Sequence, residues 1–362
     1  MLQPKYITNI ENLTHLTVEE KAALKKVSEK FVFRVNEYYL NLIDWSNPDD
    51  PLRKLVIPSG DELVEYGSWD ASEENTNYVA KGCQHKYSTT ALLLVSEICG
   101  AYCRYCFRKR LFKTDVKETV SDVSEGIDYI KKTPEINNVL LTGGDPFMLA
   151  TKKLRWIIEN VRSIEHVKII RIGSKLLAFN PMRISEDEEL LALLKEFSNE
   201  DKRIYVMAHI NHPREITGET LKAVRSLHDA GVIIVNQTPI LKGINNDSDT
   251  LSMLLDKLSW AGVTPYYFFI NRPVAGNKSF VLPLEEVYHL VEEAKGKTSG
   301  LGKRVRLVMS HSTGKIEILA IKNGIAYVKY HQSRDHDYGK FMLFKCPENA
   351  SWFDDLLPMN ND

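Results

Sequence analysis

The chain has 362 residues, of which 43% are hydrophobic and 26% charged, and its formal net charge is −1. The composition is ordinary for a soluble globular enzyme, and the length suits one large catalytic domain with appendages. The balanced charge gives no reason to expect nucleic acid or an anionic membrane surface as a partner. No apolar run has the length of a signal-peptide core or a membrane helix, and an odd set of five cysteines speaks against a disulfide framework. We therefore expect a soluble, cytoplasmic protein.

The first part of the chain, residues 1–84, is polar and rich in helix formers. Val18–Asn36 carries a helical spacing of apolar residues, and Pro48, Pro51 and Pro58 punctuate the stretch that follows. We expect a helical N-terminal region with a looped connector.

Residues 85–300 alternate short apolar runs with amphipathic stretches. Six strands are predicted, at Thr90–Ser96, Asn138–Thr142, Val167–Ile172, Ile204–His209, Val232–Gln237 and Pro265–Ile270. Five helices are predicted between them, at Val120–Lys132, Lys152–Ser163, Ser185–Phe197, Gly218–Ala230 and Thr250–Trp260. Ser185 and Glu188 have capping-box spacing, and Gly231 and Gly262 stand where a helix end needs a left-handed residue.

Six β-then-α units predict an α/β fold in which crossover helices join parallel strands. Strands that are apolar throughout fit a sheet covered on both faces. Periodicity leaves a doubly wound sheet and a full or partial barrel open, but in each of them the active site lies at the carboxyl ends of the strands. Several chemically interesting residues are expected just after strands: Cys99, Gly143–Asp145, Ser174, Asn211 and Gln237.

Residues 301–362 are expected to form a small β-rich C-terminal segment. Val305–Val308 and Ile316–Lys322 are predicted strands, and Asn323-Gly324 after the second is a strong two-residue hairpin signal.

Three of the five cysteines, Cys99, Cys103 and Cys106, lie within eight residues in the spacing C-x3-C-x2-C. Thiolates suit iron–sulfur clusters or zinc, and either site ordinarily takes four ligands. Three close ligands would leave one iron of a cluster open to a small molecule. The alternative is a zinc site completed by Cys83 or Cys346, which we otherwise expect to be buried or incidental thiols.

The cysteine spacing after a first parallel strand resembles the radical S-adenosylmethionine superfamily. The resemblance implies a partial, six-stranded (β/α) barrel and a 4Fe-4S cluster whose open iron is chelated by S-adenosylmethionine. One-electron reduction, by a donor such as flavodoxin or ferredoxin, then yields a 5′-deoxyadenosyl radical. The resemblance also implies that Gly143 and Gly144 contact the methionyl amine and that Asp145 helps to orient it. Alone, these glycines would indicate only a tight turn.

A closer resemblance is to the lysine 2,3-aminomutase family. It is carried, in order, by Cys103-Arg-Tyr-Cys106-Phe-Arg108, Gly143–Pro146, Arg171–Ser174, His209–Thr217, Asn236–Gly243 and Gly314-Lys315-Ile316. The family carries pyridoxal 5′-phosphate, whose aldehyde a lysine holds as an imine, and Lys315 occupies that place. The implied reaction moves an α-amino group to the β-carbon of an amino acid after removal of a β-hydrogen. Without the resemblance, Lys315 would be one surface lysine beside a strand.

The family pattern also implies roles for polar residues around the two cofactors. Arg108 falls on the arginine that binds the substrate carboxylate, as a guanidinium can by two parallel hydrogen bonds. Lys86 falls near the coenzyme phosphate. The family pattern also implies that Ser174, His209, Asn211 and Gln237 face the cofactors. The basic run around the cysteines, Arg104 and Arg108–Arg110, predicts a buried anion site rather than a solvated face.

The chain departs from lysine aminomutases at the places where two aspartates grip the substrate ammonium. Here these places read Asn271-Arg272-Pro273 and Val308-Met309-Ser310. An arginine would repel an ammonium, so we expect Arg272 to bind an acidic or neutral polar substrate end, such as that of glutamate or aspartate. The tail holds one cysteine, Cys346, so no zinc is expected there, and a homo-oligomer remains open. The alternatives are lysine 2,3-aminomutase proper, a family member with another hydrogen abstraction, an electron-transfer iron–sulfur protein and a zinc-stabilised binding module.

Overall fold

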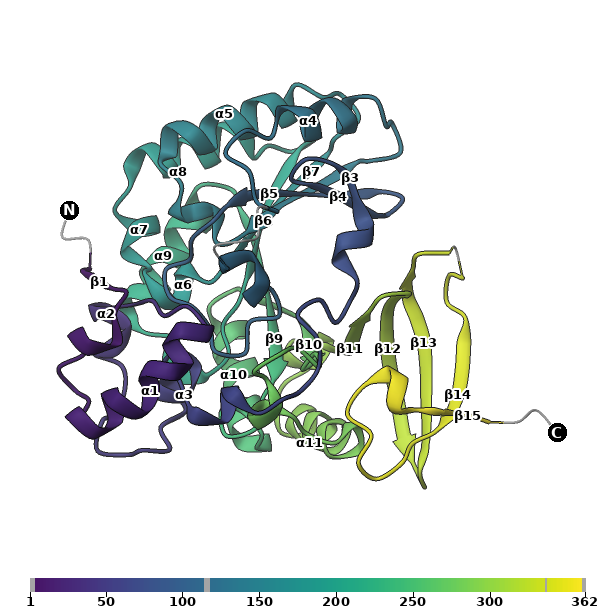
Figure 1. Ribbon diagram of the computed structural model, residues 1–362. Helices are drawn as coiled ribbons and strands as arrows, with labels where there is room; N and C mark the ends of the chain where they lie inside the picture. Colours follow the sequence, from purple (N-terminus) through teal and green to yellow (C-terminus); the bar gives the residue numbers. More distant parts are fainter. Residues whose placement is uncertain (1–3, 114–117, 336, 360–362) are drawn as a thin grey trace.

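The centre of the molecule is one sheet of 13 strands, seen in a computed structural model that describes residues 4–113, 118–335 and 337–359 (Figure 1). Seven consecutive strands pair in parallel. They are β5 (Thr90–Ser96), β6 (Asn138–Gly143), β7 (Ile169–Ser174), β8 (Arg203–Ala208), β9 (Ile233–Ile240), β10 (Thr264–Ile270) and β11 (Arg306–His311). The six predicted strands are confirmed, and β11 adds a seventh parallel strand that carries the sheet past residue 300.

Antiparallel strands extend the sheet at both edges. The edge before β5 holds β3 (Tyr78–Ala80) and β4 (Cys83–Tyr87). The edge beyond β11 holds β12 (Gly314–Lys322), β13 (Ile325–Ser333), β14 (Phe341–Lys345) and β15 (Leu357–Pro358). Asn323 and Gly324 have φ angles of 53° and 69°, which confirms the predicted tight hairpin between β12 and β13. Between the edges β3 and β15, the order of the strands follows the order of the chain.

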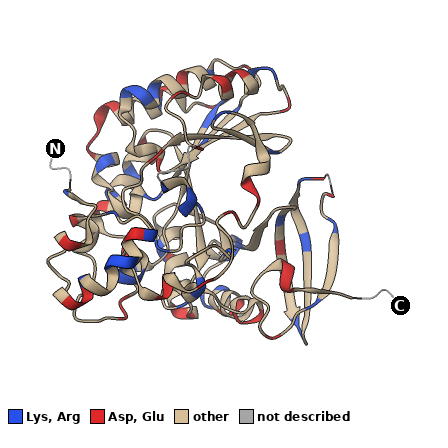
Figure 2. Ribbon diagram, in the orientation of Figure 1, with Lys and Arg blue, Asp and Glu red and all other residues tan. Residues whose placement is uncertain are grey.

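The helices α4, α5, α8 and α9 run along the outer side of the parallel strands, with α10 and α11 near β10 (Figure 1). Their bounds are α4 (Ser124–Lys131), α5 (Thr151–Arg162), α6 (Leu176–Phe179), α7 (Met182–Ser185), α8 (Glu188–Phe197), α9 (Gly218–Asp229), α10 (Ser248–Trp260) and α11 (Leu284–Lys297). Gly231 and Gly262 have φ angles of 73° and 75°, as predicted for helix ends. Acidic and basic residues are interspersed on these helices (Figure 2). None of the helices in the described ranges combines the length and apolar character that a bilayer crossing needs.

Two details of the predicted helices are wrong. The helix predicted at Ser185–Phe197 begins later, at Glu188, because the Asp187 side chain caps α8 by accepting from the Leu190 N–H, and Ser185 is instead the last residue of the short helix α7. The predicted capping box of Ser185 and Glu188 therefore does not form. The helix predicted at Val18–Asn36 ends at Lys30, and a short strand follows it.

The N-terminal region packs against one end of the parallel strands (Figure 1). It contains β1 (Tyr6–Ile7), α1 (Val18–Lys30), β2 (Val35–Asn36), α2 (Glu37–Leu40) and α3 (Pro51–Val56). Leu13, Leu52 and Leu55 are fully buried, in the same apolar core as the strand residues Leu93 and Leu141. A second apolar core lies around β10–β13 and α11 and includes Phe268, Val291 and Trp352.

Candidate active site

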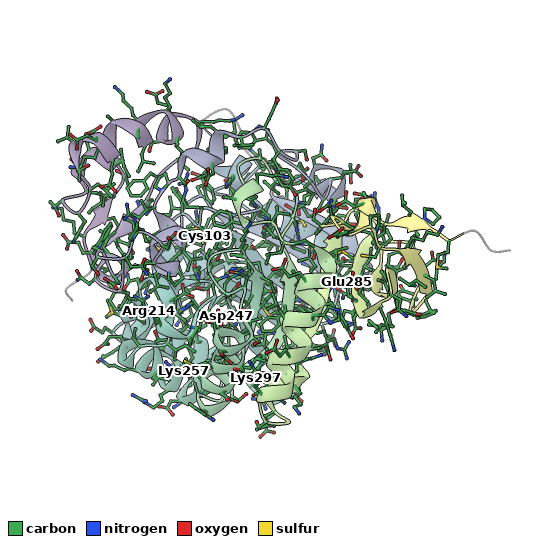
Figure 3. The ribbon with its side chains drawn as sticks, turned by 90° about the horizontal axis from the view of Figure 1, so that it is seen from below. Cys103, Arg214, Asp247, Lys257, Glu285 and Lys297 are labelled. Atoms are coloured by element: carbon green, nitrogen blue, oxygen red, sulfur yellow. The ribbon has the colours of Figure 1, made fainter. Side chains whose placement is uncertain are left out.

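The cysteine loop, Cys99–Cys106, follows β5 and is anchored on the N-terminal region. The Tyr102 N–H donates to the Arg34 carbonyl at 2.9 Å, and the Arg104 N–H donates to the Leu55 carbonyl at 2.9 Å. The Arg104 guanidinium binds the buried Glu62 carboxylate by two bonds of 2.8 Å each. In Figure 3, Cys103 lies between the N-terminal helices and the elements that carry Arg214 and Lys257. The N-terminal region thus holds the loop in place.

The end of β6 supports the loop from the other side by direct backbone contact. The Gly144 N–H donates to the Ser96 carbonyl at 2.7 Å, and the Asp145 N–H donates to the Ile98 carbonyl at 2.8 Å. A Cβ at Gly144 would lie 2.4 Å from the Ile98 carbonyl oxygen, and Gly143 has a φ of 108°. The two glycines therefore let β6 approach the segment that enters the cysteine loop.

The three thiols of the loop form no disulfide and are only partly exposed. The loss of water around each thiol raises its pKa, to about 12 for Cys103. Within the described ranges, no three His, Cys, Asp or Glu side chains are grouped as ligands of a single metal ion. The thiolates of a four-iron cluster instead bind different irons. Three soft sulfur donors on one anchored loop, none of them in a disulfide, fit such a cluster. The remaining cysteines, Cys83 and Cys346, are buried free thiols, as predicted.

Asp145 joins the end of β6 to the end of β7. Its carboxylate accepts hydrogen bonds from the Ser174 hydroxyl at 2.9 Å and from the Lys175 N–H at 2.8 Å, and it also caps the Phe147 N–H at 3.1 Å. Burial raises the pKa of Asp145 to about 6. Both predicted residues, Asp145 and Ser174, are therefore at the strand ends and in contact with each other.

His209 and Asn211, after β8, belong to a buried network that the sequence did not predict. The Lys175 ammonium donates to the His209 carbonyl at 2.9 Å, to Asn211 Oδ1 at 2.6 Å and to Glu215 Oε1 at 2.8 Å. The Tyr105 hydroxyl, from the cysteine loop, donates to Asn211 Oδ1 at 2.7 Å and lies 2.9 Å from His209 Nε2. We call these five residues the Lys175 network.

Two groups in the Lys175 network bear on ligand binding. Burial, with the charge of Lys175, lowers the pKa of His209 to about 3, so the ring is neutral near pH 7. The Asn211 Nδ2 atom is buried and has no hydrogen-bond partner, and the same holds for Asn271 Nδ2 after β10. Two unsatisfied donors at the carboxyl ends of strands fit a ligand with acceptor oxygens, as S-adenosylmethionine has.

Arg108 and Arg272 meet at a carboxylate that the sequence analysis missed. Glu74 accepts from Arg108 Nε at 3.1 Å and Nη2 at 3.3 Å, and from Arg110 Nη2 at 2.9 Å. Arg272 Nη1 lies 3.6 Å from the same carboxylate. Burial opposes the charge of Glu74, but the three guanidiniums outweigh it and hold the pKa of Glu74 far below its usual range. We call Glu74, Arg108, Arg110 and Arg272 the Glu74 cluster.

Lys315, on β12, lies among positive charges and aromatic rings. Its ammonium nitrogen is 4.2 Å from the centroid of the Tyr267 ring. Burial, with the charges of Arg171, Arg272 and Lys86, lowers the pKa of Lys315 to about 7. Lys86 donates to the His311 carbonyl at 2.5 Å, and burial lowers its pKa to about 8. A partly deprotonated amine beside cations fits an aldehyde coenzyme with an anionic phosphate.

Gln237 does not lie at a strand end, contrary to the prediction. The apolar run stops at Val235, but β9 continues to Ile240, so Gln237 is in its interior, in register with Tyr267 of β10. Its partly buried position is thus near the ring that Lys315 contacts.

The basic run of the cysteine motif is buried, as predicted, but its anions are carboxylates of the chain itself. Glu62 forms ion pairs with Arg104 and Lys109, and Glu74 forms ion pairs with Arg108 and Arg110. Buried cations are stable only beside buried anions, so the four cations of this run require carboxylates from elsewhere in the chain. That requirement was the one signal in the sequence for Glu62 and Glu74, which lie in the polar stretch before β3.

Comparison with known proteins agrees with this geometry. Residues 93–254 match the Radical SAM superfamily model. The chain is 52% identical to the "Putative L-lysine 2,3-aminomutase" of Aquifex aeolicus (strain VF5) over 98% of this chain and 96% of that protein. It is 34% identical to the L-lysine 2,3-aminomutase of Clostridium subterminale (81% of this chain, 70% of that one). It is 36% identical to the glutamate 2,3-aminomutase of Clostridioides difficile (strain 630) (82% and 70%).

The match of 52% extends over nearly the whole chain, and the cysteine loop and the strand-end glycines that support it fall inside the segment that matches the superfamily model. The chain therefore belongs to the radical SAM superfamily and, within it, to the family of lysine and glutamate 2,3-aminomutases.

Proposed function

We propose that the protein is a pyridoxal phosphate-dependent 2,3-aminomutase that acts on a dicarboxylic amino acid such as glutamate or aspartate. The observation that carries the substrate class is the charge around Lys315. The positive charges of Lys86, Arg171 and Arg272 act on Lys315, and Glu74 is already shared by three guanidiniums. A ligand that brings more than one negative charge would balance this site.

The substrate's far end is where lysine and glutamate differ. Arg272 is held against the Phe107 ring, with its guanidinium 3.9 Å from the ring centroid, and its Nη1 atom lies 3.6 Å from Glu74 Oε1. A lysine ammonium beside Arg272 and Lys86 would be buried among like charges. A carboxylate there would gain charge-assisted hydrogen bonds. The identities of 34% and 36% do not separate these substrates, so the proposal rests on the charges.

The residues have the following proposed roles. When bound, the 4Fe-4S cluster with S-adenosylmethionine supplies hydrogen abstraction, and pyridoxal phosphate supplies an aldehyde for the migrating amine. Cys99, Cys103 and Cys106 hold the cluster, and Lys315 holds the aldehyde. Arg108 orients the α-carboxylate, Arg272 the side-chain carboxylate, and Lys86 the phosphate. Contacts to the cofactors are assigned to Gly143, Gly144, Asp145, Ser174, His209, Asn211 and Gln237.

The chain's own contribution to the reaction is positioning and the exclusion of water. Phe107 lies against both guanidiniums, 4.9 Å from Arg108 and 3.9 Å from Arg272, so it limits their motion and covers their faces. Two arginines fixed in this way would hold both ends of a dicarboxylate and keep the β-carbon in one place. A reductant and a homo-oligomeric state remain further proposals.

The test is an anaerobic assay of the reconstituted protein with reductant. Glutamate, aspartate, glutamine and lysine are offered in turn, and β-amino isomers are identified by mass spectrometry after chiral derivatisation. We expect a β-isomer of an acidic amino acid, lost in Cys106→Ala and Lys315→Ala. Lys322→Ala, on the exposed side of the same strand, is the matched control and should retain activity. β-Lysine as the main product would refute the substrate class, and 5′-deoxyadenosine without any isomer would refute the aminomutase.

A further inference from the structure

Glu74 reaches the site from outside the parallel strands. It begins a 3-10 helix, Glu74–Asn77, in the segment between the N-terminal region and β3. This segment crosses to the strand ends, where the Ser68 N–H donates to the Pro273 carbonyl at 3.0 Å and the Ser72 hydroxyl donates to the Ser310 carbonyl at 2.8 Å. A carboxylate from a separate segment is therefore placed between Arg108 and Arg272.

The bonds of Glu74 use the groups that a ligand would use. Arg108 gives Nε and Nη2 to Glu74 and Nη1 to the Thr142 hydroxyl at 2.8 Å. The two-nitrogen edge of this guanidinium, which suits a carboxylate, is thus occupied by a carboxylate of the chain. Among the described residues, Glu74 is also the only carboxylate that contacts Arg272.

We propose that Glu74 is a specificity-determining residue: a built-in carboxylate with which a substrate carboxylate must compete at Arg108 and Arg272. The inference rests on the proposed dicarboxylic substrate and deepens it. A ligand that brings a carboxylate can replace the bonds that Glu74 gives up, whereas a neutral or cationic end cannot. Glu74 therefore makes entry costly for every ligand except an anion.

Removing this charge should make the arginines better receptors for free anions. Without Glu74, Arg110 still has Asp70 at 3.4 Å and Glu118 at 2.9 Å, but Arg108 and Arg272 have no other carboxylate among the described residues. Glu74→Gln keeps the shape of the side chain and one acceptor oxygen. The variant should thus keep its fold while its affinity for anions rises.

The probe is glutarate, a dicarboxylate without an amine, titrated by calorimetry into the protein loaded with its cofactors. We expect the Kd of glutarate to fall about tenfold or more in Glu74→Gln, as for the loss of one competing buried charge pair. Glu118→Gln is the matched control, because it removes a carboxylate of Arg110 that has no contact with Arg108 or Arg272. The control should change the Kd less than about twofold.

An unchanged or weaker affinity in folded Glu74→Gln would overturn the proposal, as would no glutarate binding in either form. If Glu74→Gln does not fold, Glu74→Asp retains the charge on a shorter side chain and should bind glutarate tighter than the parent protein; an equal Kd would then count against competition. Because glutarate cannot be isomerised, this result is independent of turnover. A failed amino acid screen with a tighter Kd would refute the reaction and leave Glu74's role standing.

Discussion

Two buried charge networks flank the cysteine loop, and they differ in how their charges balance. In the Lys175 network one ammonium meets one carboxylate, and all three protons of Lys175 have acceptors within the chain. In the Glu74 cluster Arg110 also contacts Asp70 and Glu118, but Arg108 and Arg272 have only Glu74 among the described residues, and Lys86 and Lys315 add positive charge nearby. The balanced network can serve as framework by itself, whereas the unbalanced one is completed by an anion.

The largest effect is expected where the balanced network loses one partner. Glu215→Ala would leave the Lys175 ammonium buried without its carboxylate, and would also remove the acceptor of the Tyr39 hydroxyl and of the Asn211 N–H. We expect a loss of about 3–5 kcal/mol in the free energy of unfolding, measured with urea on the protein without cofactors. Glu219→Ala, at an exposed site of α9, should cost less than about 0.5 kcal/mol. A loss below about 1 kcal/mol for Glu215→Ala would mean that this network is no framework.

Features with a local sequence pattern were predictable, and features without one were not. The parallel strands were predictable because each is an apolar run with a helix pattern after it, and the cysteines because their spacing is local. The helix α11 was missed, since its acidic and basic residues surround only a few apolar positions, and β11 was separated from the core for lack of a seventh long apolar run.

The charge networks were hidden because their members are far apart in the chain. Glu74 is 34 residues from Arg108, and Glu215 is 40 residues from Lys175, with nothing local to pair them. Gln237 was misplaced because the backbone pairing of β9 with β10 continues past the apolar run to Ile240, so polar residues of β9 stay within the strand. Residue types at strand ends could therefore be predicted, but not which of them neutralise one another.

The second largest effect concerns the cysteine loop, which lies between the two networks. Gly144→Ala would push a methyl group to 2.4 Å from the Ile98 carbonyl oxygen, just before Cys99, so the backbone must shift. We expect a loss of stability of about 1–3 kcal/mol, as for overpacking, and lower iron content after reconstitution. Gly173→Ala is the matched control, because its nearest neighbours lie at 3.7 Å and neither glycine has a left-handed φ. Equal iron content in the two variants would show that the β6 contact does not position the cysteines.

The smallest effect concerns the pKa of Lys315, near the Glu74 cluster. Reductive methylation of the protein without cofactors, followed peptide by peptide with mass spectrometry, reports the free-amine fraction of Lys315 against pH. We expect a midpoint near its pKa of about 7, whereas an ordinary lysine has a pKa of about 10.4. Because the folded chain then binds fewer protons at Lys315 than the unfolded chain, this residue's contribution to stability is unfavourable below about pH 7 and improves as pH rises toward 10.4.

Lys86→Met then tests whether neighbouring charge, and not burial alone, lowers the pKa of Lys315. Lys86 is the weakest of the three cations that act on Lys315, after Arg171 and Arg272. Its loss should raise the midpoint of Lys315 by less than about one pH unit, since one unit corresponds to 1.36 kcal/mol. Lys322→Met, at an exposed site of the same strand, should leave the midpoint unchanged. A midpoint above about 9 in the parent protein would contradict the excess of positive charge from which the dicarboxylic substrate is inferred.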